Sequence, residues 1–195
     1  MSGVLSRNAG VRRYKPLFLI SCEGSVTEPE YFAFFQRHAI IKCLRAKGKS
    51  APQAVLERMN KEFDRTPFRK GDEAWLVVDK DDWNDSQLAA LHRWAEERGG
   101  VVKRGLAVSN PRFELWLLLH FETVAHPCPG HECTNRLEKH LPGYKKHLVN
   151  SAFSCESVGS AIARAKELDQ PAALDWPRKT GTTVYRLAED LLRKA

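Results

Sequence analysis

The feature that most constrains the fold is a series of short apolar runs separated by longer amphipathic segments. The clearest run, Ala-Trp-Leu-Val-Val at 74–78, and the run at 17–22 are too short for helices and are typical of buried strands. Two further strands are expected at 39–45 and 101–108. Each strand is followed by an expected helix, at 29–38, from 51 onward, at 85–98 and at 113–121. This alternation predicts an α/β fold with a mainly parallel sheet and helices on both faces.

The last third of the sequence has a different pattern. No strand is expected after Thr123, and helices are expected at about 132–141, 155–169 and 182–194. We interpret this part as a C-terminal helical cap on the sheet rather than an independent domain. The chain then divides into a basic, partly disordered arm at 1–14, an α/β core at 15–122 and a helical extension packed on the core at 123–195.

The charge balance indicates the kind of partner. The chain has 31 Lys and Arg against 24 Asp and Glu, a net charge of +7. A basic surplus favours a polyanion such as nucleic acid, because each cation set against a phosphate releases counterions. No apolar stretch approaches the ~20 residues of a membrane-spanning helix, and the N-terminus lacks the apolar region of a signal peptide. The five cysteines are odd in number and irregularly spaced, which predicts reduced thiols in a cytoplasmic protein.

Acidic residues follow two of the predicted strands. Glu23 comes directly after the first strand, and Asp79, Asp81 and Asp82 come after the third. These acids are expected to converge, because parallel strands end at one edge of a sheet and residues two apart in extended chain point the same way. Converging carboxylates repel one another, and a hard divalent cation such as Mg²⁺ or Mn²⁺ removes that conflict. All four acids are therefore candidate metal ligands, although Asp82 or Asp85 can instead cap the next helix.

Four blocks of the sequence resemble the RloB-like family. They are Glu-Gly-Ser-Val-Thr-Glu-Pro-Glu-Tyr-Phe within 18–32, Val-Asp-Lys-Asp-Asp-Trp at 78–83, Ser-Asn-Pro-Arg-Phe-Glu-Leu-Trp within 109–121 and Tyr-Arg-Leu-Ala-Glu-Asp-Leu-Leu within 182–192. RloB-like proteins are in turn similar to Toprim domains. The resemblance implies a Toprim-like fold in which a glutamate follows the first strand and an Asp-x-Asp pair follows a later one. On these grounds Glu23 matches the Toprim glutamate, and Asp79 and Asp81 match the pair.

The resemblance also implies an activity. It implies a Mg²⁺-dependent nuclease, related to OLD-family nucleases, that acts on DNA or RNA in bacterial defence against phage beside a partner ATPase of the ABC or AAA type. The chain has no G-x4-G-K-[ST] loop, so any ATPase must be another chain. Asp79 and Asp81 would hold the metal, with Glu23 as a further ligand or the general base. One alternative is a non-catalytic module that binds nucleic acid or the ATPase. Strand passage or priming ranks last, because the short chain offers no domain for a nucleophilic tyrosine.

Two further acids and two polar residues lie in the resembling blocks. Glu28 and Glu114 are candidate catalytic or metal-binding residues. Each also fits the first turn of a predicted helix, where the helix dipole favours an acid. Ser109 and Asn110 are candidates for contacting a phosphate, and an ordinary helix cap explains them equally well.

Three basic groups are candidates for binding the nucleic-acid backbone. Lys103, Arg104 and Arg112 flank predicted strand ends, so this group is the preferred candidate. A solvated face is the ordinary interpretation of such charges. It also applies to the other two groups, which are Arg136 with Lys139, Lys145 and Lys146, and Arg178 with Lys179.

A loop near the start of the extension contains metal-binding residue types. His126, Cys128, His131 and Cys133 form an H-x-C-x2-H-x-C pattern. Cys and His suit zinc, but this spacing is tighter than in the usual pairs of zinc ligands and two prolines intervene. A surface loop is the preferred interpretation and a structural zinc site is the alternative.

Overall fold

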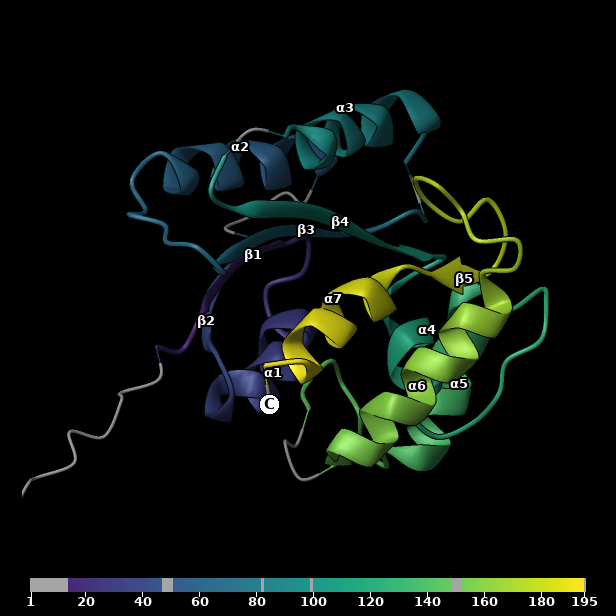
Figure 1. Ribbon diagram of the computed structural model, residues 1–195. Coiled ribbons are helices and arrows are strands. Elements are labelled where there is room, and N and C mark those ends of the chain that lie inside the picture. Colours follow the sequence, from purple (N-terminus) through teal and green to yellow (C-terminus); the bar gives the residue numbers. More distant parts are fainter. Residues whose placement is uncertain (1–13, 47–50, 82, 99, 149–151, 195) are drawn as a thin grey trace, which may run out of the picture.

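The sheet is the centre of the structure, and it is five-stranded with the order β2-β1-β3-β4-β5 (Figure 1). The computed structural model describes residues 14–46, 51–81, 83–98, 100–148 and 152–194. Residues 1–13 of the predicted arm and the candidate ligand Asp82 lie outside the described residues. The strands are β1 Leu17–Cys22, β2 Ile40–Leu44, β3 Glu73–Asp79, β4 Lys103–Asn110 and β5 Gly181–Thr182.

The first four strands are parallel, which confirms the α/β class and is consistent with a Toprim-like fold. The prediction that strands end before Thr123 is wrong, because β5 pairs antiparallel with the end of β4. Thr182 lies opposite Ser109, and Gly181 lies opposite Asn110. A strand of two residues has no periodicity of its own, so the sequence pattern could not reveal it.

Helices cover both faces of the sheet (Figure 1). The helices α2 (Pro52–Phe63) and α3 (Asp85–Glu96) pack on one face, against β1, β3 and β4. The opposite face is covered by α1 (Thr27–Ala33), α4 (Phe113–Leu118) and the helices of the C-terminal part. None of the helices among the described residues combines the length and apolar composition that a bilayer crossing requires. The helices are α1 Thr27–Ala33, η1 Phe34–Arg37 (a 3₁₀ turn), α2 Pro52–Phe63, α3 Asp85–Glu96, α4 Phe113–Leu118, α5 Gly130–His140, α6 Cys155–Leu168 and α7 Val184–Leu192.

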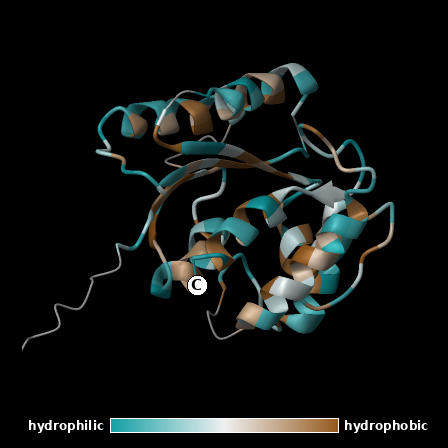
Figure 2. Ribbon diagram, viewed as in Figure 1, coloured by the Kyte–Doolittle hydropathy of each residue, from teal (hydrophilic) through white to brown (hydrophobic). Residues whose placement is uncertain are grey.

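The side-chain alternation of β3 explains how the site is oriented. Leu76 and Val78 belong to the apolar cluster under α2 and α3, whereas Trp75 and Val77 belong to the cluster on the opposite face. Figure 2 shows the apolar residues gathered along the strands and on the helices that flank them. Because side chains alternate along a strand, Asp79 continues the series of Trp75 and Val77. Its carboxylate is therefore directed toward the layer that contains α1 and α4.

Candidate functional site

A cavity of about 370 Å³ lies where the parallel strands end. Its lining comes from the end of β3, from the segments that follow β1, β2, β3 and β4, and from Lys146, far along the chain. This is the edge of an open parallel sheet at which ligands usually bind. The charged residues of the lining are Glu23, Glu28, Asp79, Asp81, Arg112, Glu114 and Lys146.

Asp79, the last residue of β3, lies among other acids. Burial raises the pKa of Asp79 well above its ordinary value, and the negative charges of Glu28, Glu23 and Glu114 raise it further. A hydrogen bond with the backbone of Phe113 acts in the opposite direction and does not outweigh these causes. The ionised form of Asp79 is therefore strained electrostatically, and a positive charge in the cavity would relieve that strain.

The carboxylate of Glu23 is held between two chain segments. Its Oε2 accepts a hydrogen bond from the backbone N–H of Asp79 at 3.0 Å, and its Oε1 accepts one from the indole Nε1–H of Trp83 at 3.0 Å. The expected convergence of Glu23 with Asp79 is thus present. The role of Trp83 was not predicted from the sequence, because nothing in its spacing signals a hydrogen bond to an acid sixty positions earlier.

Glu28 lies in the first turn of α1 and is only 5% exposed. Its Oε1 accepts a hydrogen bond from the N–H of Gly24 at 2.8 Å. A Cβ at position 24 would overlap this carboxylate, so the close approach requires glycine. Burial is the largest cause that raises the pKa of Glu28, and the charges of Glu114 and Glu23 add to it. Glu28 is therefore a buried acid of the site rather than an exposed helix-end charge.

Glu114 enters the cavity from the first turn of α4 and is also buried. Its Oε1 accepts a hydrogen bond from the hydroxyl of Tyr144 at 3.1 Å. Burial and the charge of Glu114 raise the pKa of Tyr144, so the phenol remains a donor at all ordinary pH values. No sequence pattern connects Tyr144 with the site, because thirty residues separate it from Glu114.

Asp81 lines the same cavity but has a cationic partner. Its Oδ2 forms an ion pair with the guanidinium of Arg112, and both side chains are about one-third exposed. Burial lowers the pKa of Arg112, but the hydrogen bond and charge of Asp81 outweigh it and the net effect raises the pKa. Asp81 therefore shares the cavity with Asp79, as expected, while its carboxylate is engaged by Arg112.

The carboxylates of the cavity are the donor set that a divalent cation would meet. Among the described residues, no group of three or more His, Cys, Asp or Glu side chains is already arranged around one metal position. Mg²⁺, however, takes oxygen ligands, keeps several waters and commonly uses only one or two protein carboxylates. Asp79 with Glu23 or Glu28 meets that lower requirement, and the charge repulsion around Asp79 is what a cation would offset. The residues therefore fit a hard cation that is held partly through water.

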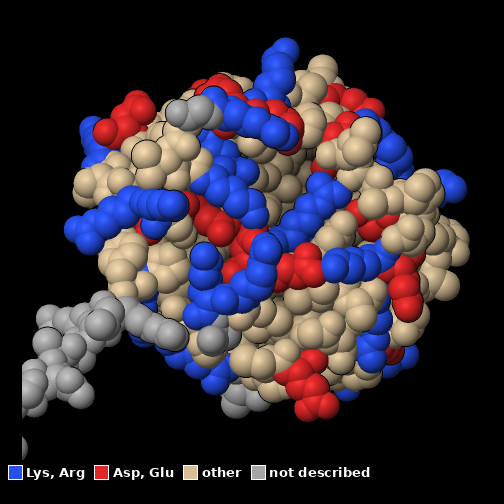
Figure 3. All heavy atoms as spheres, in the orientation of Figure 1, with Lys and Arg blue, Asp and Glu red and all other residues tan. Residues whose placement is uncertain are grey.

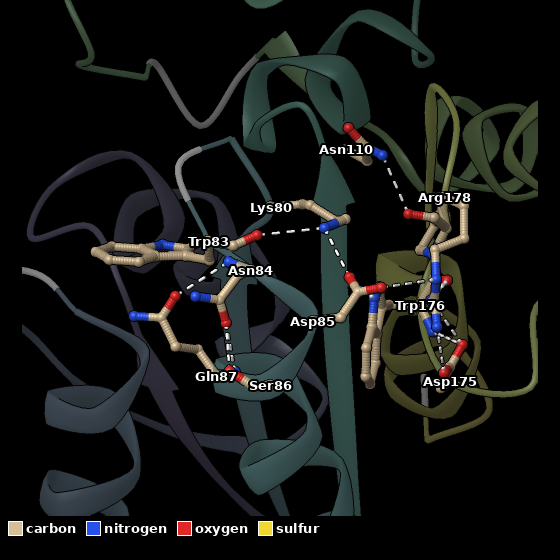
Figure 4. A network of polar contacts seen from close by, with 11 residues as sticks. Lys80, Trp83, Asn84, Asp85, Ser86, Gln87, Asn110, Asp175, Trp176 and Arg178 are labelled. Atoms are coloured by element: carbon tan, nitrogen blue, oxygen red, sulfur yellow. Dashed lines mark hydrogen bonds and ion pairs between the residues drawn. The ribbon is translucent and has the colours of Figure 1, made fainter.

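The turn that carries Asp81 and Trp83 is fastened at its end (Figure 4). Lys80 Nζ donates to the carbonyl of Trp83 at 3.2 Å and to Asp85 Oδ1 at 3.0 Å. The same Asp85 oxygen accepts from Trp176 Nε1 at 3.3 Å, which ties the turn to the loop before β5. Asp85 is therefore an ion-pair partner, and the residue that caps α3 is Asn84.

Two predicted nucleic-acid-binding residues lie far from this cavity. Lys103 and Arg104 begin β4, and Lys103 lies beside the first residue of β3, so they are at the opposite end of the sheet. Lys103 forms ion pairs with Glu73 and Asp190, and Arg104 forms one with Glu97. Their predicted place beside the acids is wrong. Figure 3 shows how closely Lys and Arg side chains lie against Asp and Glu on the face that it draws.

The predicted phosphate-contacting pair also has other partners. Ser109 is fully buried, and its hydroxyl forms a hydrogen bond of 2.9 Å with that of Thr182. Asn110 Nδ2 donates to the carbonyl of Pro177 at 3.1 Å. Both residues belong to β4, so they hold β5 and its preceding loop on the sheet, and the prediction that they face a substrate is wrong for Ser109.

The His- and Cys-containing loop does not bring its four side chains together. Cys128 and Cys133 are buried with their Sγ atoms 3.0 Å apart, whereas His126 and His131 are exposed. Burial raises the pKa of Cys133, which opposes the thiolate form that binds zinc. Among the described residues these side chains form no group that could hold a metal, which disfavours the zinc alternative. The surface-loop interpretation is wrong for His131 and Cys133, because both belong to α5.

The chain was compared with known proteins. A family model described as RloB-like protein matches residues 18–191, which include the acids of the cavity and nearly all of β1 and α7. No curated protein and no solved structure matches the chain. Since the match covers most of the sequence, the chain belongs to the RloB-like family.

Proposed function

We propose that this protein is a metal-dependent nuclease that hydrolyses phosphodiester bonds of DNA or RNA in the cavity at the strand ends. The observation that carries the proposal is the crowding of carboxylates around Asp79. Burial and the neighbouring acids together raise the pKa of Asp79. A soluble fold does not need such repulsion, and catalytic sites commonly contain it. A divalent cation, Mg²⁺ or Mn²⁺, is the simplest partner that would make the arrangement favourable.

Glu23 and Asp79 are the residues that would hold this cation, and Asp81 could join them if its ion pair with Arg112 opened. When bound, a divalent cation lowers the pKa of water and neutralises charge that develops on a phosphoryl group. The hydrogen bonds from Trp83 and from the Asp79 backbone orient Glu23 in advance. Such preorganisation reduces the cost of assembling the site.

Glu28 is the best placed general base. Its raised pKa brings its titration closer to neutral pH, where a carboxylate can both take and return a proton. Glu28 Oε1 is engaged by the N–H of Gly24, so its position in the cavity wall is fixed. Glu114, held by Tyr144, supplies the negative charge that helps to raise the pKa of Glu28.

A cleavage assay tests the proposed function. The purified chain is incubated with end-labelled single-stranded DNA, double-stranded DNA and RNA, each in Mg²⁺, Mn²⁺ or EDTA. Cleavage that requires a divalent cation and stops in EDTA is the expected result. The absence of cleavage on all three substrates, with a folded and metal-loaded protein, would count against the proposal.

Arg112 is the cation best placed to bind the substrate phosphate in the cavity. Its Nε is buried without a hydrogen-bond partner among the described residues. A Cβ at Gly130, the first residue of α5, would overlap that Nε. Gly130→Ala is therefore expected to displace the guanidinium and slow cleavage by up to ~100-fold, because misplacing a group by about 1 Å can cost that much. The measurement is kcat and KM on the substrate that the wild type cleaves best.

The matched control for Gly130→Ala is Gly159→Ala. Gly159 is exposed within α6, and a Cβ there would have nothing within 4 Å. Alanine should stabilise that helix by about 0.5–1 kcal/mol and leave cleavage unchanged. If both alanine variants cleave at the wild-type rate, Arg112 has no part in the reaction.

The Asp81–Arg112 ion pair favours one alternative, a non-catalytic module that binds nucleic acid or an ATPase. In such a module the pair would be a permanent structural contact. A non-catalytic module would bind nucleic acid without cleaving it in the presence of a divalent cation. The cleavage assay therefore distinguishes this module from the nuclease.

We extend the proposal to defence against phage together with a separate ABC- or AAA-type ATPase, because the resemblance of the sequence blocks implies that setting. The test is phage plating on cells that express the chain with its neighbouring ATPase. Protection that is lost with Asp79→Asn is expected, and equal protection by both forms would contradict a nuclease-based defence.

A further inference from the structure

The segment 142–148, which we name the cationic strap, follows α5 and passes beside the carboxylate cavity. It contains Lys145, Lys146 and His147. From the sequence alone, a solvated face is the ordinary interpretation of Lys145 and Lys146. The structure instead ties the strap to the two helices that supply buried acids, α1 and α4.

Several contacts anchor the strap. The Tyr144 hydroxyl donates to Glu114 Oε1 at 3.1 Å, and the Thr27 hydroxyl donates to the carbonyl of Lys146 at 2.8 Å. Beyond Lys146, Glu30 accepts from the N–H of Leu148 at 2.6 Å and contacts Nδ1 of His147 at 3.0 Å. The strap is therefore fixed on both sides of Lys146, at residues close to the site.

The backbone of Lys146 has an unusual conformation. Its φ is +67°, in the left-handed region that residues with a side chain rarely adopt. Such a conformation costs on the order of 1 kcal/mol and persists only when surrounding contacts impose it. The anchors on both sides supply those contacts, and the result is that Lys146 lines the cavity with the acids.

The two lysines of the strap have no acidic partner among the described residues. Lys42, Lys80 and Lys166 each form an ion pair with an acid. By contrast, the side chains of Lys145 and Lys146 form no ion pair or hydrogen bond with any described residue. Within the described part of the chain, no single acid therefore pairs with either ammonium group. A cavity rich in carboxylates repels a polyanion, so cations at its edge are needed to retain one.

We propose that the cationic strap binds the phosphate backbone of the nucleic acid that enters the cavity, with Lys145 and Lys146 each contacting a phosphate. This inference rests on the proposed nuclease function and identifies the surface that holds the substrate. The strain at Lys146 is then explained, because the left-handed turn places a cation beside the reacting phosphate. Release of counterions from the contacted phosphates supplies the binding free energy.

The test is the salt dependence of binding by the double variant Lys145→Gln/Lys146→Asn. Asparagine is chosen because it tolerates the left-handed conformation while removing the charge. Binding of a fluorescent single-stranded oligonucleotide is measured by anisotropy over a range of KCl concentrations in EDTA, so that no cleavage occurs. The slope of log K against log salt should fall in magnitude by about 1.4, since each lost contact with a single strand removes about 0.7.

The control is the double variant Lys61→Gln/Lys70→Gln. Both lysines are exposed, and they lie at the end of α2 and just before β3, at the far end of the sheet. Their loss should leave the salt slope unchanged although the net charge falls equally. A wild-type slope in the strap variant, or an equal fall in both variants, overturns the proposal.

The outcome is separable from that of the nuclease proposal, because binding is measured without a divalent cation. If the salt slope depends on the strap but the chain never cleaves, the strap proposal is supported and the nuclease proposal is contradicted. If the chain cleaves but the strap variant binds with the wild-type salt slope, the nuclease proposal is supported and the strap proposal is contradicted.

Discussion

Replacing Asp79 with Asn is expected to reduce divalent-cation-dependent cleavage by at least ~100-fold, because even the hydrogen-bonding partners of metal ligands cost ~10–100-fold when they are changed. Asp79 is the acid on which the negative charges of Glu23, Glu28 and Glu114 act together. Asparagine keeps the size of the side chain and removes the charge that would bind the cation. The measurement is the initial cleavage rate at saturating Mg²⁺.

Asp64→Asn is the matched control for this substitution. Asp64 is exposed directly after α2, and no ion pair with a described residue involves it. Its loss removes the same charge without touching the cavity, so the cleavage rate should not change. Equal rates for wild type and Asp79→Asn would show that the carboxylate cluster takes no part in catalysis.

Asp79→Asn is also expected to stabilise the protein when no metal is present. Near neutral pH the folded chain must either retain the proton of Asp79 or ionise the carboxylate against its neighbours, and each unit by which the pKa is raised costs up to about 1.4 kcal/mol of stability. Asparagine avoids that cost. The unfolding temperature in EDTA at pH 7.5 should therefore rise, by about 2–4 °C for each kcal/mol recovered.

The pH dependence has a definite sign. An acid whose pKa is higher in the folded state keeps its proton when the unfolded chain has lost its own, so stability falls as pH increases. For Asp79 and Glu28 this fall begins near the ordinary carboxylate range, about pH 4, and continues to their raised folded pKa values. Urea unfolding of wild type and Asp79→Asn at several pH values should show a steeper fall for the wild type.

Adding Mg²⁺ should reverse the order of the two proteins. A cation that binds the folded state stabilises it by mass action, so the wild type should gain stability and Asp79→Asn should not. Asp64→Asn should behave as the wild type does. A destabilised Asp79→Asn in EDTA, or an equal response of all three proteins to Mg²⁺, would contradict the electrostatic account.

Local patterns predicted the parts of the fold that depend on neighbouring residues. The runs at 17–22 and 74–78 were predicted as buried strands, and they are β1 and β3. The acids that follow those strands were predicted to meet, and Glu23 does contact the backbone of Asp79. Both inferences rest on local features of a strand, namely its length and the edge of the sheet at which it ends.

The missed parts depend on contacts between distant segments. Asp81 pairs with Arg112, and Trp83 donates to Glu23, because β3 lies between β1 and β4 in the sheet. Lys146 reaches the cavity because Tyr144 is anchored to α4. None of these partners has a fixed spacing in the sequence, so periodicity carries no information about them.

The misplaced basic residues show a second limit. Lys103 and Arg104 were assigned to a strand end near the site, yet they are the first residues of β4. A boundary error of two residues, from 101 to 103, does not explain this, because the acids lie at the other end of the strand. In a parallel sheet, residues that begin a strand lie at the opposite edge from residues that end one. Asp79 ends β3 and lies at the site, whereas Lys103 and Arg104 begin β4 and do not.

Isothermal titration of Mn²⁺ into the wild type and into Asp79→Asn tests the central claim most directly, because it asks whether the crowded carboxylates bind a cation. We expect saturable binding to the wild type, with a heat that depends on the buffer because Mn²⁺ displaces protons from acids with raised pKa values. Asp79→Asn should bind far more weakly. No saturable heat with the wild type, or the same isotherm with both proteins, would contradict the account.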